Sequence, residues 1–376
     1  MRVVITGGGT GGHLSVARAF LHAFVAKGWE CAFIGSSGGQ DRMYFEKESD
    51  FKQKWFLQTH GVVNQRGIGL LKSLWKQACA LKEACRILKE FQADFVLSVG
   101  GYSAAPAAFG ACLLKIPLII HEQNAEIGRL NRLLKPFAKV FFSSYLENSP
   151  IKFYPISSVF FEKARVRNKI ENVLFMGGSQ GAKAINNFAL SVIGTLKRRG
   201  IKVFLQSGKA DFTRVIEECK KENLSIGVLG ELELKKLDSK IKKVNLDSIN
   251  SVDIVVFDFY DDMASVYGLC DFAVCRAGAS SLWELCANGL PALFVPYPYA
   301  AGNHQYYNAK FIEEKGLGFL CLEKDLFNEV LWECLELLED KITQISENLQ
   351  KECSLNATKQ MCEIIARKLC ENFLIS

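Results

Sequence analysis

The chain has 376 residues, of which 49% are apolar and 23% charged, and this composition excludes a disordered chain. At roughly 150 residues per domain, the length corresponds to about two domains. The net charge of +6 is too small to indicate a nucleic-acid-binding protein. No apolar stretch of about 18 residues predicts a membrane-spanning helix, and no apolar run near Met1 predicts a signal peptide, so we expect a cytoplasmic chain.

The cysteines are scattered along the chain. There are 13 of them, an odd number, and no two form a Cys-x-x-Cys pair. Most lie in apolar segments, as Cys31 and Cys275 do. This pattern favours buried thiols in a reducing compartment over a zinc site or a disulfide framework.

Short apolar runs alternate with helical patterns in the first 150 residues. Five runs predict strands: Val3–Ile5, Cys31–Ile34, Phe95–Val99, Leu118–Ile120 and Val140–Phe142. Between the first two, Leu14–Ala26 repeats apolar residues every three or four positions, which predicts a buried helix that Gly28 ends. Continuous apolar strands separated by helices indicate a parallel sheet covered on both faces.

The same pattern begins again in the second half. A predicted strand at Asn172–Met176 precedes a glycine turn and a helix from Ala182. Further predicted strands are Val203–Leu205, Ile254–Phe257, Phe272–Cys275 and Ala292–Val295. We therefore predict an α/β fold with two Rossmann-like domains, residues 1–155 and 170–340, followed by C-terminal helices over 341–376. The Lys-rich stretch between Glu231 and Asp253 is interpreted as an irregular surface insertion.

The first glycine turn, Gly7–Gly12, contains the pattern G-x-G-x-x-G between a strand and a helix. Glycines allow a close approach of an anion, and the helix N-terminus supplies N–H donors. A dinucleotide site needs an acidic residue about 20 positions later, but the second strand ends in Gly35–Gly38 without one. This argues against a nicotinamide or flavin site. His13 closes the turn, where it could take a proton from a hydroxyl or only cap the helix.

Two later segments also place polar groups at helix starts. Gly178–Gly181 forms either an anion-binding turn or a simple tight turn. In Arg276–Glu284 a strand leads through glycine into a helix whose N-terminus suits a diphosphate. Glu284 could accept hydrogen bonds from ribose hydroxyls or only stabilise the first helical turn, and Gln305 could contact a sugar or cap its helix.

The acidic residues do not predict a metal site. The sequence has no Asp-x-Asp pair to hold a metal between phosphates. Among Asp258, Asp261 and Asp262, capping of a helix by Asp261 is the simpler interpretation. We expect helix dipoles to stabilise a leaving diphosphate and expect neither a metal nor a cofactor.

Five motifs then occur in a fixed order: Gly7–His13, Gly100–Ser103, His121–Asn124, Gly177–Ala182 and Arg276–Glu284. In these motifs the chain closely resembles the MurG family, over nearly its whole length. These are the undecaprenyldiphospho-muramoylpentapeptide β-N-acetylglucosaminyltransferases, which form lipid II for peptidoglycan. The resemblance implies a GT-B fold, with UDP-N-acetylglucosamine on the C-terminal domain and the lipid-linked acceptor, lipid I, on the N-terminal one. The reaction would invert the anomeric centre as the muramoyl 4-hydroxyl displaces UDP.

The resemblance also implies roles for individual residues. His13 would be the catalytic base. Glu284 would hold the ribose, Ser179 a phosphate, and Tyr260 would lie at the uracil. The full set of implied substrate-binding residues is Thr10, Gly11, Gly12, Asn124, Ser179, Gln180, Tyr260, Glu284 and Gln305.

Two motifs depart from the family pattern. The family carries Gly-Asn-Pro-Val-Arg at the domain link, with the arginine near the donor phosphates, whereas this chain has Phe153–Ser157. Arg165 or Arg167 could replace that arginine. The family's paired glutamines become His304 and Gln305.

A lipid acceptor would require contact with a membrane surface. Residues 66–90 contain six basic and two acidic residues, a difference of +4. The apolar residues that could enter the headgroup region are Leu70, Leu71, Leu74 and Trp75. The alternative is an ordinary amphipathic helix packed on the sheet. With a lipid-linked acceptor implied, we favour peripheral binding to an anionic surface on the cytoplasmic face of the cell membrane.

Three other functions stay open at this point. A different UDP-sugar glycosyltransferase or a UDP-sugar epimerase would share the fold. A non-catalytic nucleotide-sugar-binding protein would fit the missing link arginine. A dehydrogenase would bind NAD at the first glycine turn.

Overall fold

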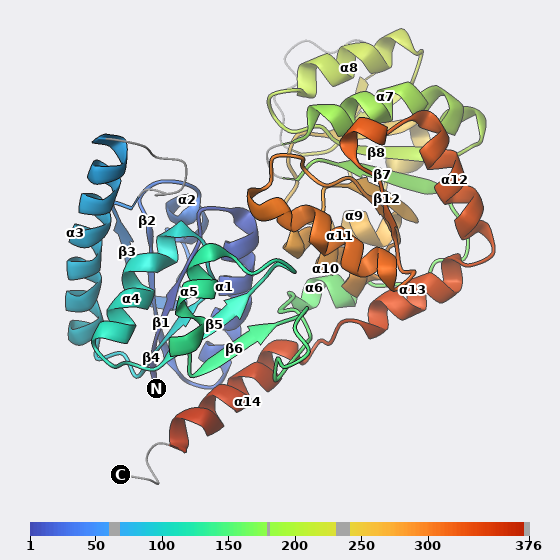
Figure 1. Cartoon of the computed structure of the whole chain (residues 1–376). Helices are drawn as coiled ribbons and strands as arrows, with labels where there is room; N and C mark the ends of the chain where they lie inside the picture. Colours follow the sequence, from blue (N-terminus) through green and yellow to red (C-terminus); the bar gives the residue numbers. More distant parts are fainter. Residues whose placement is uncertain (60–67, 179–180, 231–240, 372–376) are drawn as a thin grey trace. The chain divides into compact units, whose positions relative to one another are not determined.

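The computed structural model describes residues 1–59, 68–178, 181–230 and 241–371, without the side chains of 68–72, 74 and 250. The chain divides into two compact units (Figure 1). The N-terminal unit comprises residues 1–157 and 354–376, and the C-terminal unit comprises residues 158–353. The sequence-based boundaries were 155 and 170, with residues 341–376 apart as terminal helices.

The N-terminal unit is built on a six-stranded parallel sheet with the order β3-β2-β1-β4-β5-β6. Its strands are β1 (Arg2–Thr6), β2 (Glu30–Ser36), β3 (Phe51–Leu57), β4 (Phe95–Ser98), β5 (Leu118–Glu122) and β6 (Val140–Ser143). Five of them lie where the apolar runs predicted strands. The sequence did not predict β3, because this edge strand carries Lys52, Gln53 and Lys54 in place of a continuous apolar run.

Helices pack on this sheet from both sides. They are α1 (Gly11–Ala26), α2 (Asp41–Phe45), α3 (Ile68–Phe91), α4 (Ala105–Leu113), α5 (Arg129–Leu134) and α14 (Ala357–Cys370), with 3-10 turns η1 (Tyr102–Ala104) and η2 (Lys135–Phe137). Val4 and Val96 belong to one core with buried residues of α3 and α4. Phe95, adjacent to Val96 and therefore on the other face, contacts Phe24 of α1, and α14 packs against α1.

The C-terminal unit is built on an eight-stranded parallel sheet with the order β10-β9-β11-β8-β7-β12-β13-β14. Its strands are β7 (Asn172–Met176), β8 (Lys202–Gln206), β9 (Ile226–Val228), β10 (Ile241–Lys243), β11 (Ile254–Phe257), β12 (Phe272–Cys275), β13 (Ala292–Phe294) and β14 (Phe319–Leu320). The predicted irregular stretch after Glu231 is wrong in part, because Ile241–Lys243 pairs with β9 as a strand. Residues 231–240 lie outside the described part.

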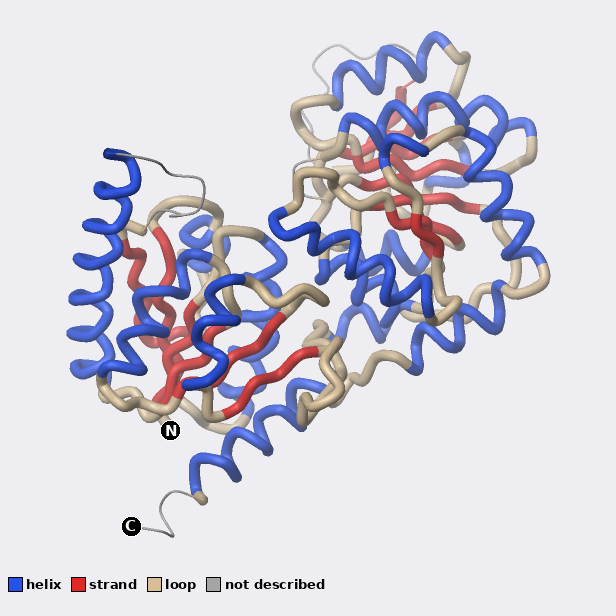
Figure 2. Tube along the Cα trace, in the orientation of Figure 1, coloured by secondary structure: helices blue, strands red, loops and turns tan. Residues whose placement is uncertain are grey.

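Helices surround this second sheet as well, as the tube in Figure 2 shows. They are α6 (Ser158–Glu162), α7 (Lys183–Arg198), α8 (Phe212–Lys221), α9 (Met263–Leu269), α10 (Ala279–Asn288), α11 (His304–Glu314), α12 (Asn328–Glu339) and α13 (Ile342–Lys351), with 3-10 turns η3 (Ile249–Ser251), η4 (Ala301–Asn303) and η5 (Glu323–Asp325). Among the described residues, no helix is both long and apolar enough to cross a bilayer.

The arginines after the domain link are part of this second core. Arg165 donates to the backbone oxygens of Gly268 and Cys270 and pairs with Asp271. Arg167 is fully buried and donates to the backbone oxygens of Tyr267 and Cys270 and to Asn288. Both guanidinium groups thus fasten α9 and α10 to the link.

Candidate active site

The first glycine turn joins β1 to α1 at the carboxyl edge of the N-terminal sheet. Strand order reverses between β1 and β4, and ligands of open parallel sheets bind beyond the strand ends at such a switch point. The backbone N–H of Gly8 donates to the Gly100 oxygen over 3.2 Å, which joins the loops after these two strands. A Cβ on Gly7 would lie 2.5 Å from that oxygen, so the close approach requires glycine.

Thr10 and His13 form a pair at the start of α1. The Thr10 hydroxyl and the His13 Nδ1 lie 2.8 Å apart, with Thr10 exposed and His13 half-buried. The His13 Nε2 faces Gly100, where a Cβ would lie 3.5 Å from it. If Nδ1–H donates to Thr10, Nε2 carries the lone pair that a general base needs. Gly11 and Gly12 form the first turn of the helix, whose N–H groups suit an anion.

Asn124 follows β5, two places from β1 in the sheet. Its loop is organised by the buried carboxylate of Glu122, which accepts from the Asn124 N–H and the Gly128 N–H, both at 3.0 Å. The same carboxylate accepts from the Asn131 amide at 2.9 Å. The structure therefore places Thr10, Gly11, Gly12, His13 and Asn124 along one edge of one sheet, and their predicted roles in substrate binding stay predictions.

His121 lies beneath this edge as a fully buried side chain. Its ring packs edge-on against Phe20 and Tyr154, at 5.8 and 5.6 Å between centroids. Within the described residues neither ring nitrogen has a hydrogen-bond partner. Burial lowers the pKa of His121 from 6.5 to about 3, with a further contribution from His13, so the imidazole is neutral near pH 7.

This burial predicts that His121 makes the fold acid-sensitive. The unfolded chain binds a proton at His121 below pH 6.5, whereas the folded chain does so only near pH 3. Above pH 6.5 this histidine has no effect of pH on stability. As the pH drops from 6.5 toward 3, it lowers the free energy of unfolding by up to about 1.4 kcal/mol per pH unit. We expect His121→Phe to flatten this dependence, measured as the free energy of unfolding in urea over that range. Parallel curves for the two proteins would contradict the expectation.

The second glycine turn joins β7 to α7, at the switch point between β7 and β12 in the C-terminal sheet. Gly181 has φ +72° and donates its N–H to the Gly178 oxygen over 2.9 Å. Ser179 and Gln180, predicted to contact a phosphate, lie outside the described residues. Helix α10 begins beyond the neighbouring strand β12, with Gly278 at its N-cap. Two helix N-termini thus follow adjacent strands at this edge, an arrangement suited to a diphosphate.

Glu284 and Tyr260 are the predicted ribose and uracil contacts. Glu284 lies on α10, and burial raises the pKa of its carboxyl from 4.5 to about 7. Tyr260 follows β11 as a half-buried side chain, and burial raises the pKa of its hydroxyl above 10. A carboxyl whose pKa is raised by burial is a common feature of functional sites.

Gln305 lies in the first turn of α11. Its side-chain oxygen accepts from the Tyr297 N–H over 2.9 Å, which holds the loop before the helix. Arg276, from the fifth motif, donates to the Val295 oxygen and pairs with Glu323 at 2.5 Å. Both side chains therefore support the loop after β13.

One sequence-based expectation about acidic residues is wrong. The cap of α9 is Asp262 and not Asp261, because the Asp262 carboxylate accepts from the Ser265 N–H at 3.1 Å. Gly35–Gly38 has no acid, as expected, but Asp41 at the start of α2 is buried and accepts from the Gly9 N–H of the glycine turn. The only sequence feature that could have indicated this contact is the presence of an acid six positions after Gly35. Within the described part, no cluster of three or more His, Cys, Asp or Glu residues could hold a metal.

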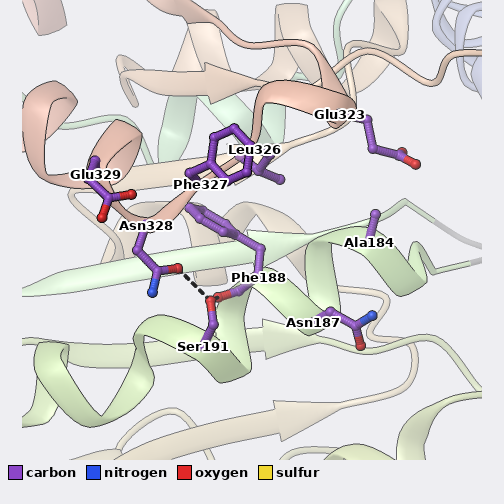
Figure 3. A pocket seen from close by; sticks show the side chains of 9 residues that line it. All are labelled: Ala184, Asn187, Phe188, Ser191, Glu323, Leu326, Phe327, Asn328 and Glu329. Carbon is purple, nitrogen blue, oxygen red and sulfur yellow. Dashed lines mark hydrogen bonds between the residues drawn. The ribbon is translucent and has the colours of Figure 1, made fainter.

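A separate hollow of about 410 Å³ lies between α7 and the segment before α12 (Figure 3). Its lining includes Asn187, Ser191 and Phe327, and the Ser191 hydroxyl donates to the Asn328 side-chain oxygen over 2.7 Å. None of the predicted site residues lines it. The hollow is therefore not the predicted donor site.

The two parallel sheets, each with a glycine turn at its switch point, are the two Rossmann-like domains of the GT-B fold. The fold is shared with the glycosyltransferase SnogD from Streptomyces nogalater, at a TM-score of 0.61 and 13% identity over 98% of this chain and 99% of that one. Residues 3–143 match the glycosyltransferase family 28 N-terminal domain, and residues 172–367 match the corresponding C-terminal domain.

Relatives place the chain more narrowly. It is 47% identical to the UDP-N-acetylglucosamine--N-acetylmuramyl-(pentapeptide) pyrophosphoryl-undecaprenol N-acetylglucosamine transferase of Wolinella succinogenes, over 97% of this chain and 99% of the relative. The protein of the same name from Sulfurimonas denitrificans is 45% identical, over 98% of this chain and 99% of the relative. The crystal structure of Acinetobacter baumannii MurG matches with a TM-score of 0.72 and 26% identity, over 97% and 99%. The chain belongs to the MurG family of glycosyltransferases.

Proposed function

We propose that this chain transfers N-acetylglucosamine from UDP-N-acetylglucosamine to the muramoyl 4-hydroxyl of lipid I, which gives lipid II for peptidoglycan synthesis. The observation that carries the proposal is the 47% identity to a transferase named for this reaction, over 97% of the chain. The C-terminal unit binds the donor in this proposal, and the N-terminal unit binds the lipid-linked acceptor.

In the proposed reaction His13 removes the proton from the acceptor 4-hydroxyl. The hydroxyl oxygen then forms a bond to the anomeric carbon as the bond from that carbon to the UDP oxygen breaks, which inverts the centre. The leaving diphosphate gains charge, and the N-termini of α7 and α10 stabilise it. Thr10 keeps the His13 ring in the tautomer that accepts the proton.

We propose that side chains at the edge of the C-terminal sheet contact UDP-N-acetylglucosamine. Glu284 accepts from the ribose hydroxyls, Ser179 and Gln180 contact phosphate, and Tyr260 lies at the uracil. Gln305 binds the sugar. In the N-terminal unit, Thr10, Gly11, Gly12 and Asn124 are the proposed substrate contacts. The N–H groups of the glycine turn hold the acceptor diphosphate.

Incubation of the protein with UDP-N-acetylglucosamine and no acceptor distinguishes a transferase from a UDP-sugar epimerase. A transferase leaves UDP-N-acetylglucosamine unchanged without an acceptor, whereas an epimerase inverts a sugar carbon. We expect proton NMR of the donor with the protein to show no second UDP-sugar. Appearance of an epimeric sugar would contradict the proposed function.

We also propose that α3 binds the membrane surface. Trp75 on this helix is a large apolar side chain that is 73% exposed. Glu83 and Glu90, the two acids of the segment, both pair with Arg86. The exposed Lys82 and Lys89 on the same helix carry positive charge that anionic lipids would attract. The side chains of Leu70, Leu71 and Leu74 lie outside the described ones.

The double substitution Leu70→Glu and Trp75→Glu tests this surface. It replaces apolar contact with negative charge, so we expect binding to vesicles containing phosphatidylglycerol to weaken by at least about tenfold. Co-sedimentation measures the bound fraction. The matched control is Leu337→Glu with Leu355→Glu, two exposed leucines outside α3, the first in the C-terminal unit and the second in the C-terminal part of the N-terminal unit. Equal binding by both variants would contradict a role for α3.

A further inference from the structure

Asp41 is a buried carboxylate between two glycine turns of the N-terminal unit. It begins α2, and its side chain is fully excluded from solvent. Its Oδ1 accepts from the Gly9 N–H at 2.5 Å, and its Oδ2 accepts from the Ser36 N–H at 2.8 Å. Short hydrogen bonds to an ionised acceptor are stronger than those between neutral groups. One side chain therefore ties the turn after β1 to the loop after β2.

The surrounding backbone is shaped to hold this carboxylate. A Cβ on Gly8 would lie 2.5 Å from Asp41 Oδ1, and a Cβ on Gly35 would lie 3.0 Å from Oδ2. Tyr102 closes the far side of the turn, because a Cβ on Gly9 would lie 2.7 Å from its ring. The Tyr102 hydroxyl donates to the Gly38 oxygen over 3.2 Å, so it joins the same two loops.

Gly9 is directly followed by Thr10, which pairs with His13. We propose that Asp41 is a positioning residue, which fixes the Gly9 peptide and through it the Thr10–His13 pair and the N–H groups that face the acceptor. The inference rests on the proposed function, since it assumes that the acceptor binds at this turn. Both oxygens of Asp41 accept from backbone N–H groups, so this acid after β2 has a structural partner for each oxygen and is not a ribose contact of a dinucleotide site.

Asp41→Asn tests the inference with little change of volume. The amide must turn its NH₂ toward either Gly9 or Ser36, so one N–H loses its acceptor. We expect kcat/KM for a lipid I analogue to fall by at least about tenfold, because the reacting groups are misplaced. The Kd for UDP-N-acetylglucosamine changes much less, because Glu284 and the other proposed contacts of the nucleotide lie in the C-terminal unit. Hydrogen exchange of the Gly9 amide accelerates.

The matched control is Asp50→Asn, the same chemical change at an exposed position of the same unit. Equal transfer and equal Gly9 exchange in the two variants would overturn the inference. Absence of transfer by the unaltered chain would instead count against the proposed function, and the exchange of Gly9 still decides whether Asp41 holds the turn.

A double-mutant cycle separates positioning from general damage. Gly8→Ala pushes a methyl group into the Asp41 carboxylate, and Asp41→Ala removes that clash, whereas the strain of alanine at a φ of +158° is the same in both backgrounds. We expect Gly8→Ala to reduce kcat/KM for the acceptor by a larger factor in the unaltered chain than beside Asp41→Ala. Multiplicative losses, with circular dichroism and thermal unfolding showing that all variants are folded, would overturn the inference.

Discussion

His13→Ala is expected to lower kcat for transfer by about 10²- to 10⁴-fold, the range over which a positioned general base acts. The imidazole is the group at the glycine turn that can accept a proton near neutral pH. Its Nδ1 is 2.8 Å from the Thr10 hydroxyl, which orients the ring with Nε2 toward Gly100. The Kd for UDP-N-acetylglucosamine changes much less than kcat, because the proposed contacts of the nucleotide lie in the C-terminal unit. Steady-state kinetics with a lipid I analogue measure the loss.

His22→Ala is the matched control, since His22 is an exposed residue of the same helix. It should leave kcat unaltered. Thr10→Val should share part of the His13 defect, because it removes the hydroxyl that orients the ring while keeping a side chain of similar volume. Full turnover by His13→Ala at saturating substrates would assign the base to another group.

Glu284→Gln is expected to weaken donor binding by about 10- to 100-fold while it stabilises the fold. Loss of a charged acceptor for the ribose hydroxyls corresponds to about 1.5–3 kcal/mol. The pKa of the Glu284 carboxyl is about 7 in the folded chain and 4.5 ordinarily, so ionisation opposes folding increasingly between these pH values. Above pH 7 the variant should be more stable by up to about 3 kcal/mol. Calorimetric titration with the donor and unfolding in urea measure the two effects.

The raised pKa of Glu284 also predicts how the affinity for UDP-N-acetylglucosamine changes with pH. The ionised carboxylate is the better acceptor, so the affinity for UDP-N-acetylglucosamine should rise through pH 7 by up to about tenfold over two pH units. Glu284→Gln should abolish this rise. A donor affinity that falls as the pH rises, or a variant with the original pH profile, would contradict a ribose contact by Glu284.

Much of the fold follows from sequence pattern, because strands buried on both faces carry continuous apolar runs. The strands β1, β2 and β7 illustrate this, and each leads into a glycine turn. The pattern fails where burial is partial or the strand is short. The edge strand β3 has a polar middle, and β14 has only two residues.

The candidate site was less accessible to sequence reasoning. The glycine turns and His13 are local features that a linear pattern reveals. The contact of Asp41 with Gly9 joins residues 32 positions apart, so it depends on how β2 and its loop lie beside β1. The raised pKa of Glu284 likewise depends on burial that no local pattern encodes. The helix cap was misplaced by one residue because Asp261 and Asp262 are adjacent and only backbone geometry distinguishes them.

Release of UDP from UDP-N-acetylglucosamine, with and without a lipid I analogue, tests the proposed transfer most directly. The account predicts release that depends on the acceptor, together with a β-linked N-acetylglucosaminyl-muramoyl product. Release at the same rate without the acceptor, or donor binding with no transfer to it, would contradict the account.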